Sequence, residues 1–328
     1  MRQPTMADIA RHAGVSRIAV SYALNDQPGV SRATRERIRG IARDLGYRAN
    51  GTALALHGAT AEAVGLVMLR SSAAFTVEVF RRELIAGIEA ELSLRGFGLA
   101  WQFVAGVDEE VAVHRRWSAE RRVDGVLLVD LWIDDPRLAA LEAAGLPFLV
   151  IGGTPEMRGV WCDDAAAIAA AVRYLVGAGH RRLARVSGPP GMVHTEVRNA
   201  AFRAAGADVT VVAGDYTGAA GARLTRQLLR RENRPTAILY DNDVMAVAGL
   251  GVAQELGVAV PGELSIVAFD DSPLCQVVGP PLTVLKRDIA GLGQQATQLL
   301  FETVANGQRR GGQGETARLI VRGSTGPG

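Results

Sequence analysis

The sequence predicts two architectures in one chain: a small all-α head and an α/β body built from two doubly wound parallel-sheet lobes. Three observations predict this division. Positive charge and helical periodicity are concentrated in the first 57 residues. Beyond residue 61, apolar runs of strand length alternate with helical segments. The length of 328 residues leaves room for two or three domains, each large enough to bury a core.

The charge of the chain is unevenly distributed. Lys and Arg number 36 against 34 Asp and Glu, a net charge of only +2. Residues 1–57 contain nine Arg and four acidic residues, so this segment carries +5 and the rest of the chain −3. A basic module on a slightly acidic body is typical of proteins that bind nucleic acid, although a basic patch alone is also compatible with a solvated surface.

Three short helices are expected in the head. Thr5 has the chemistry of an N-cap, apolar residues then recur at spacings of three and four, and Gly14 ends the first helix. Ser16 caps the second helix, and Ser31 opens a third that ends at Gly46. Two short helices joined by a tight turn predict a helix-turn-helix, whose second helix fits the DNA major groove; a generic helical bundle is the alternative.

The body shows strand and helix patterns in alternation. Apolar runs separated by helical stretches indicate parallel strands covered on both faces, and their number suits two sheets. Helices are expected at 82–95 and 109–121, and strands at 63–69, 99–104, 123–129, 147–151, 182–186, 209–212, 237–240 and 265–269.

The sequence contains no set of residues typical of a catalytic or metal site, so we expect no enzyme activity, no cofactor and no metal. Gly291–Ala296 satisfies GxGxxA, but within a helical stretch rather than after a buried strand, and P-loop and GxSxG motifs are absent. Cys162 and Cys275 have neither disulfide nor metal-ligand spacing. Three acidic pairs are interpreted as helix caps or solvated surface rather than as metal ligands: Asp134–Asp135, Asp163–Asp164 and Asp270–Asp271.

The sequence also predicts a cytoplasmic protein with no membrane partner. It shows no apolar N-terminal leader and no uninterrupted run of 18 apolar residues. A reducing compartment suits its two isolated cysteines.

Residues of the head match one known family at many ordered positions. The matching residues are Thr5-Met6-Ala7-Asp8-Ile9-Ala10, Ala13-Gly14-Val15-Ser16, Val20-Ser21, Leu24-Asn25, Val30-Ser31, Thr34-Arg35 and Leu45-Gly46-Tyr47. They resemble the DNA-binding head of the lactose-repressor (LacI/GalR) family. This resemblance implies a transcriptional regulator, by expectation a repressor, that binds an inverted-repeat operator in double-stranded DNA as a homodimer.

The resemblance assigns base reading to the second helix. The positions implied are Arg17, Ile18 and Tyr22. A guanidinium can bond guanine O6 and N7 bidentately, an isoleucine can contact a thymine methyl, and a tyrosine offers one hydrogen bond. Thr and Arg are common in the family where this chain has Ala19 and Tyr22, so a different operator is expected. Contacts to the DNA backbone are implied for Ser16, Ser21, Asn25, Ser31 and Thr34, with helix capping as the alternative for Ser16 and Ser31.

Residues 47–57 resemble the family's hinge, which becomes helical on operator DNA and inserts a leucine into the minor groove. Gly51 lowers helix propensity by about 1 kcal/mol relative to alanine, so hinge ordering is expected to cost more here, and an inert linker is the alternative. Ala49, Gly51 and Leu54 depart from the family pattern, whereas the minor-groove positions Asn50, Ala53 and Leu56 match it.

The body continues the resemblance along nearly the whole chain. It resembles the family's sugar-binding core, which is similar to periplasmic binding proteins, with a ligand cleft between two lobes. The division implied is 1–48 for the helix-turn-helix domain, 49–60 for the hinge and 61–328 for effector binding and dimerisation. Within the body, the first lobe is expected at about 61–160 plus 289–320 and the second at about 161–288. The matching segments are 121–128, 146–151, 175–182, 235–237, 241–246, 260–267, 269–271 and 280–283.

The resemblance also implies an effector site for a sugar. Arg198, Asn242 and Asp270 carry groups that suit vicinal hydroxyls, and Tyr216 can stack on an apolar sugar face. The alternative for Asn242 and Asp270 is that they cap the helices after their strands. Phe75, after the first strand, is expected to line the other lobe. Alignment places Trp132 and His194 near the cleft, with packing as the alternative for both.

One departure from the family bears on ligand size. Gly152–Gly153 stands where a polar pair is common, so that wall of the cleft is expected to be roomier and able to admit an oligosaccharide. Residues 323–328 contain no heptads, which favours a dimer over a tetramer joined by such a tail. A solute-binding receptor and a cytoplasmic sugar enzyme are the alternatives. The basic head opposes the first, and no residue set proposes the chemistry of the second.

Overall fold

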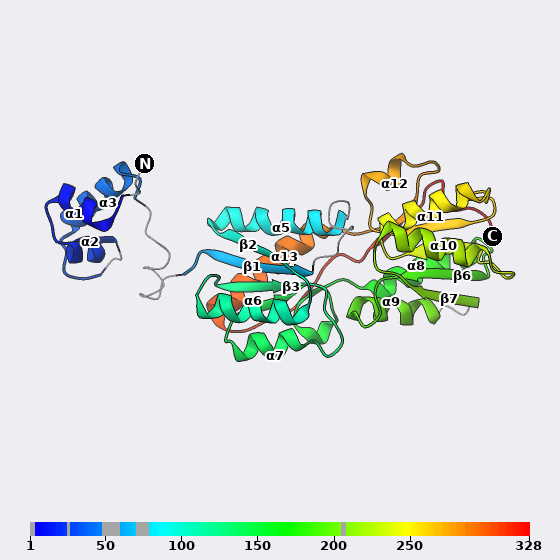
Figure 1. The fold of residues 1–328 in the computed structure, drawn as a ribbon, viewed down its shortest axis with the longest axis horizontal. Helices are drawn as coiled ribbons and strands as arrows, with labels where there is room; N and C mark the ends of the chain where they lie inside the picture. Colours follow the sequence, from blue (N-terminus) through cyan, green and yellow to red (C-terminus); the bar gives the residue numbers. More distant parts are fainter. Residues whose placement is uncertain (1–3, 25–26, 48–59, 70–78, 205–207) are drawn as a thin grey trace. The chain divides into compact units, whose positions relative to one another are not determined.

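The computed structural model describes residues 4–24, 27–47, 60–69, 79–204 and 208–328. The chain forms two compact units, Met1–Ala61 and Glu62–Gly328, which we describe separately (Figure 1). Five residues with roles implied by the sequence lie outside the described residues: Asn25, Asn50, Ala53, Leu56 and Phe75.

The first unit contains three helices, α1 (Met6–Ala13), α2 (Arg17–Leu24) and α3 (Arg32–Asp44). Thr5 and Asp8 form a capping box at the start of α1, in which the Thr5 N–H and hydroxyl both donate to Asp8 Oδ2, at 2.8 and 2.7 Å. Gly14 ends the helix with a left-handed φ of 63°. Small and branched side chains from all three helices close one core: Ile9, Ala10, Ala13, Val20, Ala23, Ile38 and Ala42.

The first lobe of the second unit is a parallel four-stranded sheet in the order β2-β1-β3-β4. Its strands are β1 (Ala63–Leu69), β2 (Gly98–Val104), β3 (Gly125–Leu128) and β4 (Phe148–Val150). Its helices are α5 (Val79–Arg95), α6 (Val107–Ala119), α7 (Pro136–Ala143) and, from far along the chain, α13 (Ile289–Asn306).

Close packing of α13 on α5 explains the glycines of the apparent nucleotide motif. A Cβ on Gly293 would lie 2.6 Å from the Leu84 carbonyl oxygen of α5, and one on Gly87 would overlap the Ala290 carbonyl of α13. Gly293 therefore permits two helix backbones to approach each other, and the interpretation of GxGxxA as accidental agrees with its place inside α13.

The second lobe is a six-stranded sheet in the order β12-β10-β9-β8-β6-β7. Its strands are β6 (Arg182–Ser187), β7 (Asp208–Ala213), β8 (Ala237–Tyr240), β9 (Ser265–Phe269), β10 (Thr283–Lys286) and β12 (Arg318–Ile320). The helices of this part of the chain are α8 (Asp164–Gly177), α9 (Val193–Arg203), α10 (Gly218–Leu229), α11 (Asp243–Glu255) and the short α12 (Pro273–Val277). A short 3-10 helix, η1 (Pro155–Met157), and a parallel pair, β5 (Val160–Trp161) with β11 (Gly312–Gln313), complete the unit.

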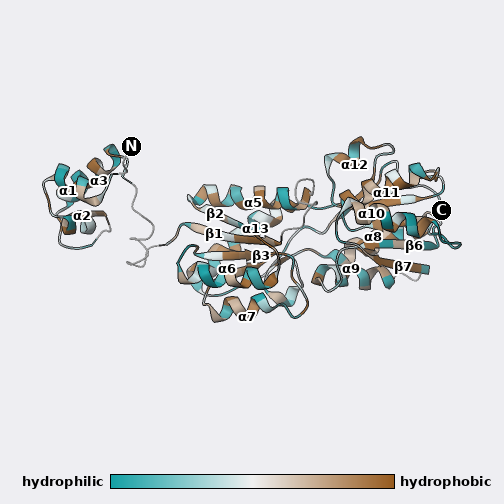
Figure 2. Cartoon of the chain, viewed as in Figure 1, coloured by the Kyte–Doolittle hydropathy of each residue, from teal (hydrophilic) through white to brown (hydrophobic). Residues whose placement is uncertain are grey.

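Apolar strands and half-apolar helices follow the predicted pattern (Figure 2). The three-helix head and the two parallel-sheet lobes are confirmed. One expectation is wrong: residues 318–320 do not belong to the first lobe. They form β12, which pairs antiparallel with β10 at the edge of the second sheet. The segment of the first lobe that begins with α13 therefore ends before β12. Hydrogen bonding to a distant strand decided this, and local sequence did not indicate it.

Candidate nucleic-acid interface and ligand pocket

One face of α2 is exposed although it carries large side chains. Ile18 is 66% exposed and Tyr22 38% exposed, whereas Val20 and Ala23 on the opposite face are fully buried. Arg17 is exposed beside Ile18 at the start of the helix. Residues 18 and 22 are one turn apart, so the three residues implied in base reading lie together on the surface of the head.

Some of the residues implied in contacts to the DNA backbone also cap helices of the head. Ser16 Oγ accepts from Ala19 N at 3.1 Å, and Ser31 Oγ accepts from Thr34 N at 3.3 Å, so both serines cap helices. Ser31 is exposed, and its hydroxyl also hydrogen-bonds that of Thr34 at 2.9 Å. Ser21 is half-buried on α2. Capping uses one lone pair of each serine oxygen and leaves room for a further contact.

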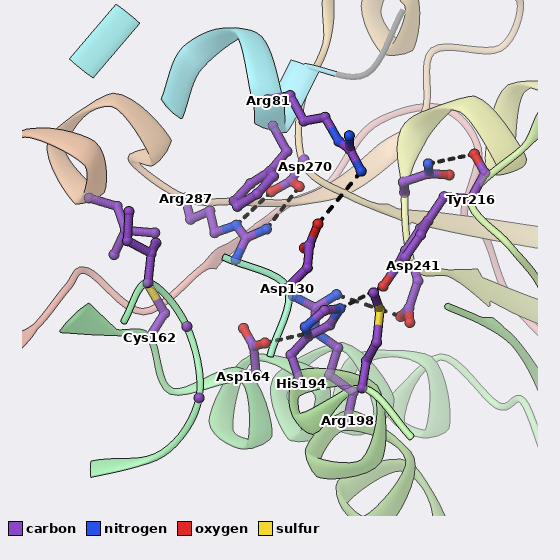
Figure 3. Close-up of a pocket in the computed structure, with 17 residues that line it drawn as sticks. Arg81, Asp130, Cys162, Asp164, His194, Arg198, Tyr216, Asp241, Asp270 and Arg287 are labelled. Atoms are coloured by element: carbon purple, nitrogen blue, oxygen red, sulfur yellow. Dashed lines mark hydrogen bonds and ion pairs between the residues drawn. The ribbon is translucent and has the colours of Figure 1, made fainter. Parts of the chain in front are cut away.

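A pocket of about 810 Å³, including its open mouth, lies in the second unit (Figure 3). Residues of both lobes line it, and many follow the carboxyl ends of strands: Asp130 after β3, Ile151 after β4, Tyr216 after β7, Asp241 after β8 and Asp270 after β9. Ligands of open parallel sheets bind at this edge, because the strand ends there leave crevices lined by loops.

Five of the residues implied for the effector site line this pocket: His194, Arg198, Tyr216, Asn242 and Asp270. Trp132 does not. Its backbone forms a bridge to Met192, and its ring lies over Gly191, beside the pocket rather than in it. Trp132 therefore packs between the lobes next to the pocket, which is the packing alternative for this residue, and an effector contact by Trp132 stays a prediction.

Arginines and carboxylates alternate around the pocket. Arg198 Nε donates to Asp164 Oδ2 at 2.8 Å, and Arg287 donates to both oxygens of Asp270 at 2.8 and 3.1 Å. At the mouth, Arg81 lies 3.6 Å from Asp130. Burial acts to raise the pKa of Asp164, but Arg198 and Arg287 outweigh it and hold that pKa below its usual value. These ion pairs set the positions of the side chains before any ligand binds.

Sequence reasoning missed several of these residues, because they become neighbours only in the folded chain. The one available signal was position: they follow strands, or belong to an acidic pair that we had interpreted as caps or surface. For Asp163 that interpretation holds, since it caps α8, but Asp164 points into the pocket. The missed lining residues are Phe80, Arg81, Asp130, Ile151, Cys162, Asp164, Met192, Asp241, Arg287 and Leu292.

The capping alternative holds for one of its two residues. Asn242 is the N-cap of α11: its Oδ1 accepts from Met245 N at 2.9 Å, and its Nδ2 donates to the Tyr216 carbonyl at 2.9 Å. Asp270 caps nothing and is paired with Arg287. Asn242 thus supports the pocket wall with most of its hydrogen-bonding capacity, whereas Asp270 presents a fixed carboxylate.

His194 and Tyr216 form a neutral pair in the wall. His194 Nε2 and the Tyr216 hydroxyl lie 2.6 Å apart. Burial, assisted by the charge of Arg198, lowers the pKa of His194 to about 4, and burial raises the pKa of Tyr216. Both groups are therefore uncharged at neutral pH and offer dipoles rather than charges to a ligand.

Three of the seven non-glycine residues with a positive φ in the described ranges line this pocket. Asp130, Tyr216 and Asp270 have positive φ angles of 53°, 66° and 67°, a conformation that residues other than glycine seldom adopt. Such strain persists where surrounding structure enforces it, and it commonly marks functional sites. Gly152 and Gly153 line the pocket with φ angles of 92° and 87°, and a Cβ on Gly152 would meet no atom within 4 Å. The wall is therefore open at Gly152, whereas a Cβ on Gly153 would lie 2.7 Å from Met157 Sδ.

One buried acceptor in the pocket lacks a protein partner. Asp164 is 9% exposed, and its Oδ1 has no hydrogen-bond partner among the described residues. An unsatisfied carboxylate oxygen is costly to bury, so a hydroxyl donor from a ligand would be stabilising there. Within the described ranges, no three His, Cys, Asp or Glu side chains cluster as metal ligands would, and no helix is long and apolar enough to cross a membrane.

Comparison with known proteins gives the same two parts. Residues 5–50 match the model of the bacterial regulatory proteins of the lacI family, and residues 172–325 match a periplasmic binding protein-like domain. The chain is similar to the HTH-type transcriptional regulator CelR of Thermobifida fusca, with 33% identity over 98% of this chain and 96% of CelR.

Two solved structures extend the comparison. A CelR–cellobiose complex is 30% identical over 98% of this chain and 99% of its own, with a TM-score of 0.74. A lac repressor dimer bound to operator and the anti-inducer ONPF is 25% identical over 99% of this chain and 100% of its own, with a TM-score of 0.83. Since the similarity to such regulators spans head and body alike, this chain belongs to the LacI family of transcriptional regulators.

Proposed function

We propose that this protein is a cytoplasmic repressor that binds an inverted-repeat operator as a homodimer and is controlled by a neutral sugar in the pocket of its second unit. Residues 1–48 bind DNA, residues 49–60 form the hinge, and the rest of the chain binds the effector and dimerises. The exposed face of α2 supports base reading by Arg17, Ile18 and Tyr22, since an isoleucine 66% exposed on a basic head is suited to an apolar contact with DNA.

The charge balance of the pocket carries the assignment of a neutral ligand. Asp130, Asp164, Asp241 and Asp270 line it together with three arginines, and a fourth arginine, Arg185, is paired with Asp241 behind the wall. A charged ligand would leave one buried charge uncompensated, which is strongly unfavourable. A polyol satisfies such a site, because each hydroxyl can donate to a carboxylate and accept from a guanidinium.

The open space at Gly152 supports a ligand longer than one sugar ring. The complex of CelR with cellobiose, a disaccharide, is consistent with that size. Ligand binding would change operator affinity by favouring one arrangement of the two lobes, a coupling of about 1 to 3 kcal/mol in typical allosteric proteins.

Two linked experiments test this proposal. Selection from a random duplex pool at near-physiological salt should enrich a palindrome that the purified protein protects. A panel of cellobiose, maltose, sucrose and trehalose, titrated against that operator complex, should then contain a sugar that changes operator affinity. If the protein enriches no DNA sequence, the proposal of operator binding is contradicted. If no neutral sugar alters operator affinity, the proposal of a sugar effector is contradicted.

A further inference from the structure

An ion pair that the sequence analysis did not single out joins the pocket wall to the sheet behind it. Arg185 on β6 and the side chain of Asp241 are both fully buried. Arg185 Nη2 donates to the two oxygens of Asp241 at 2.5 and 2.6 Å, and Gly188 N donates to Oδ2 at 2.7 Å. On its other side, Arg185 Nη1 donates to Asn199 Oδ1 on α9. Asp241 is thus held from the sheet and from the loop after β6.

Asp241 in turn faces the arginine implied in ligand binding. Its Oδ1 lies 3.8 Å from Arg198 Nη1. Arg198 is also held at Nε by Asp164, and its guanidinium carbon lies 3.7 Å from the centroid of the Phe269 ring. Two edges and one face of the guanidinium are therefore restrained, while no described contact uses Nη2, and Arg198 lines the pocket (Figure 3).

Stability alone is a poor reason for the Arg185–Asp241 pair. Burying two charges costs several kcal/mol in desolvation, and apolar residues of similar volume commonly serve as well or better. Asn199, the second partner of Arg185, is the immediate neighbour of Arg198 on α9. The Arg185–Asp241 pair therefore connects β6, the loop after β6 and α9 next to Arg198.

We propose that Arg185 is a positioning residue for ligand recognition: it fixes Asp241, and Asp241 holds Arg198 in the orientation that binds the ligand. This inference rests on the proposed sugar effector. A free arginine side chain has to be ordered when a ligand binds, and that entropy loss weakens affinity. With Asp164, Asp241 and Phe269 around it, Arg198 is ordered in advance.

The test removes both charges together, because either single loss would leave a buried charge and risk unfolding. Arg185→Met with Asp241→Asn keeps the volume of both side chains, and the new amide oxygen can still accept from Gly188 N. Arg185→Lys keeps the charge behind Asp241. Tyr240→Phe is the matched control: it removes a fully buried 2.6 Å hydrogen bond to Thr225 in the same lobe without touching Arg198.

The Kd of each full-length variant is measured by calorimetric titration. The probe is whichever of cellobiose, maltose, sucrose and trehalose binds the unmodified protein most tightly. We expect the double variant to bind about three- to tenfold more weakly, the factor implied by ordering one long side chain. Arg185→Lys should retain most of the affinity. Tyr240→Phe should melt earlier with an unchanged Kd, and operator affinity without sugar should be the same in all four proteins.

The decisive comparison repeats the titration with Arg198→Lys as the starting protein, which keeps a positive charge beside Asp164 but removes the Nη1 group that Asp241 faces. If Arg185 and Asp241 act through Arg198, their removal should cause no further loss in that background, a coupling that double-mutant cycles measure directly. The same loss in both backgrounds would overturn the assignment, because Asp241 would then contact the ligand itself or act only on stability. Unchanged affinity in the double variant would overturn it as well. If no neutral sugar binds the unmodified protein, the proposed function fails first, and this inference fails with it.

Discussion

Replacement of Asp164 by asparagine tests whether the ligand binds at Oδ1, the buried carboxylate oxygen that has no hydrogen-bond partner among the described residues. Arg198 Nε donates to Oδ2 at 2.8 Å, so an asparagine at this position must turn its amide oxygen towards Arg198. Its NH₂ then occupies the place of Oδ1. The change keeps the shape of the side chain but converts a charged acceptor facing the ligand into a neutral donor.

The size of the effect follows from the lost hydrogen bond. A hydrogen bond to a charged group contributes about 1.5 to 3 kcal/mol, and each 1.4 kcal/mol is a factor of ten in Kd, so sugar affinity should fall by roughly 10- to 150-fold. The fold should survive, because Arg198 keeps Asp241 as a partner and Asp163, rather than Asp164, caps α8. Operator affinity without sugar should therefore be unchanged.

Calorimetric titration with the tightest-binding neutral disaccharide measures this loss, and thermal melting verifies the fold. Asp163→Asn is the matched control, since it alters the adjacent carboxylate, can still accept from Ala166 N and lies outside the pocket lining. It should leave Kd unchanged. An Asp164→Asn protein that binds within twofold of the unmodified protein would refute the reasoning, because Oδ1 would then not receive a ligand hydroxyl.

Three further predictions concern the head, the pocket wall and a buried charge cluster. Arg17→Ala should weaken operator binding by about 1 to 3 kcal/mol and relax preference at one base pair per half-site, measured by competition with operator variants; a uniform loss over all sequences would make Arg17 a phosphate contact. Gly152→Ala adds a methyl group to the open wall at a φ of 92° and should reduce affinity for disaccharides more than for monosaccharides; equal losses for both would place the ligand elsewhere. Burial raises the pKa of Glu110 to about 7, although Arg137 donates hydrogen bonds to it as well as to Asp135. The folded chain therefore holds this proton up to about pH 7, whereas the unfolded chain releases it near pH 4.5. The contribution of the Glu110 proton to the free energy of unfolding is complete below pH 4.5 and is lost as the pH rises to 7. Since Glu110→Gln mimics the protonated form, its stability relative to the unmodified protein should rise by about 3 kcal/mol across that window in urea unfolding, and a pH-independent difference would contradict the prediction.

The sequence was most informative where structure depends on neighbours along the chain. Thr5, Gly14, Ser16 and Ser31 begin or end helices because caps act within a few residues, and the strands beyond residue 61 were recognisable because a buried parallel strand is a continuous apolar run. The order of motifs in the head sufficed to indicate the LacI family.

Tertiary structure decided the chemistry of the pocket. Asp164, Asp241 and Arg287 come from three places in the chain, and only the packing of strand ends and crossovers makes them partners of Arg198 and Asp270. The assignment of 318–320 to the first lobe was wrong because the pairing of β12 with β10 is non-local, and alignment could place Trp132 near the cleft without giving the direction of its side chain. Residue types and local order determine helices, strands and family, whereas the electrostatics of the site arise from distances that no local pattern encodes.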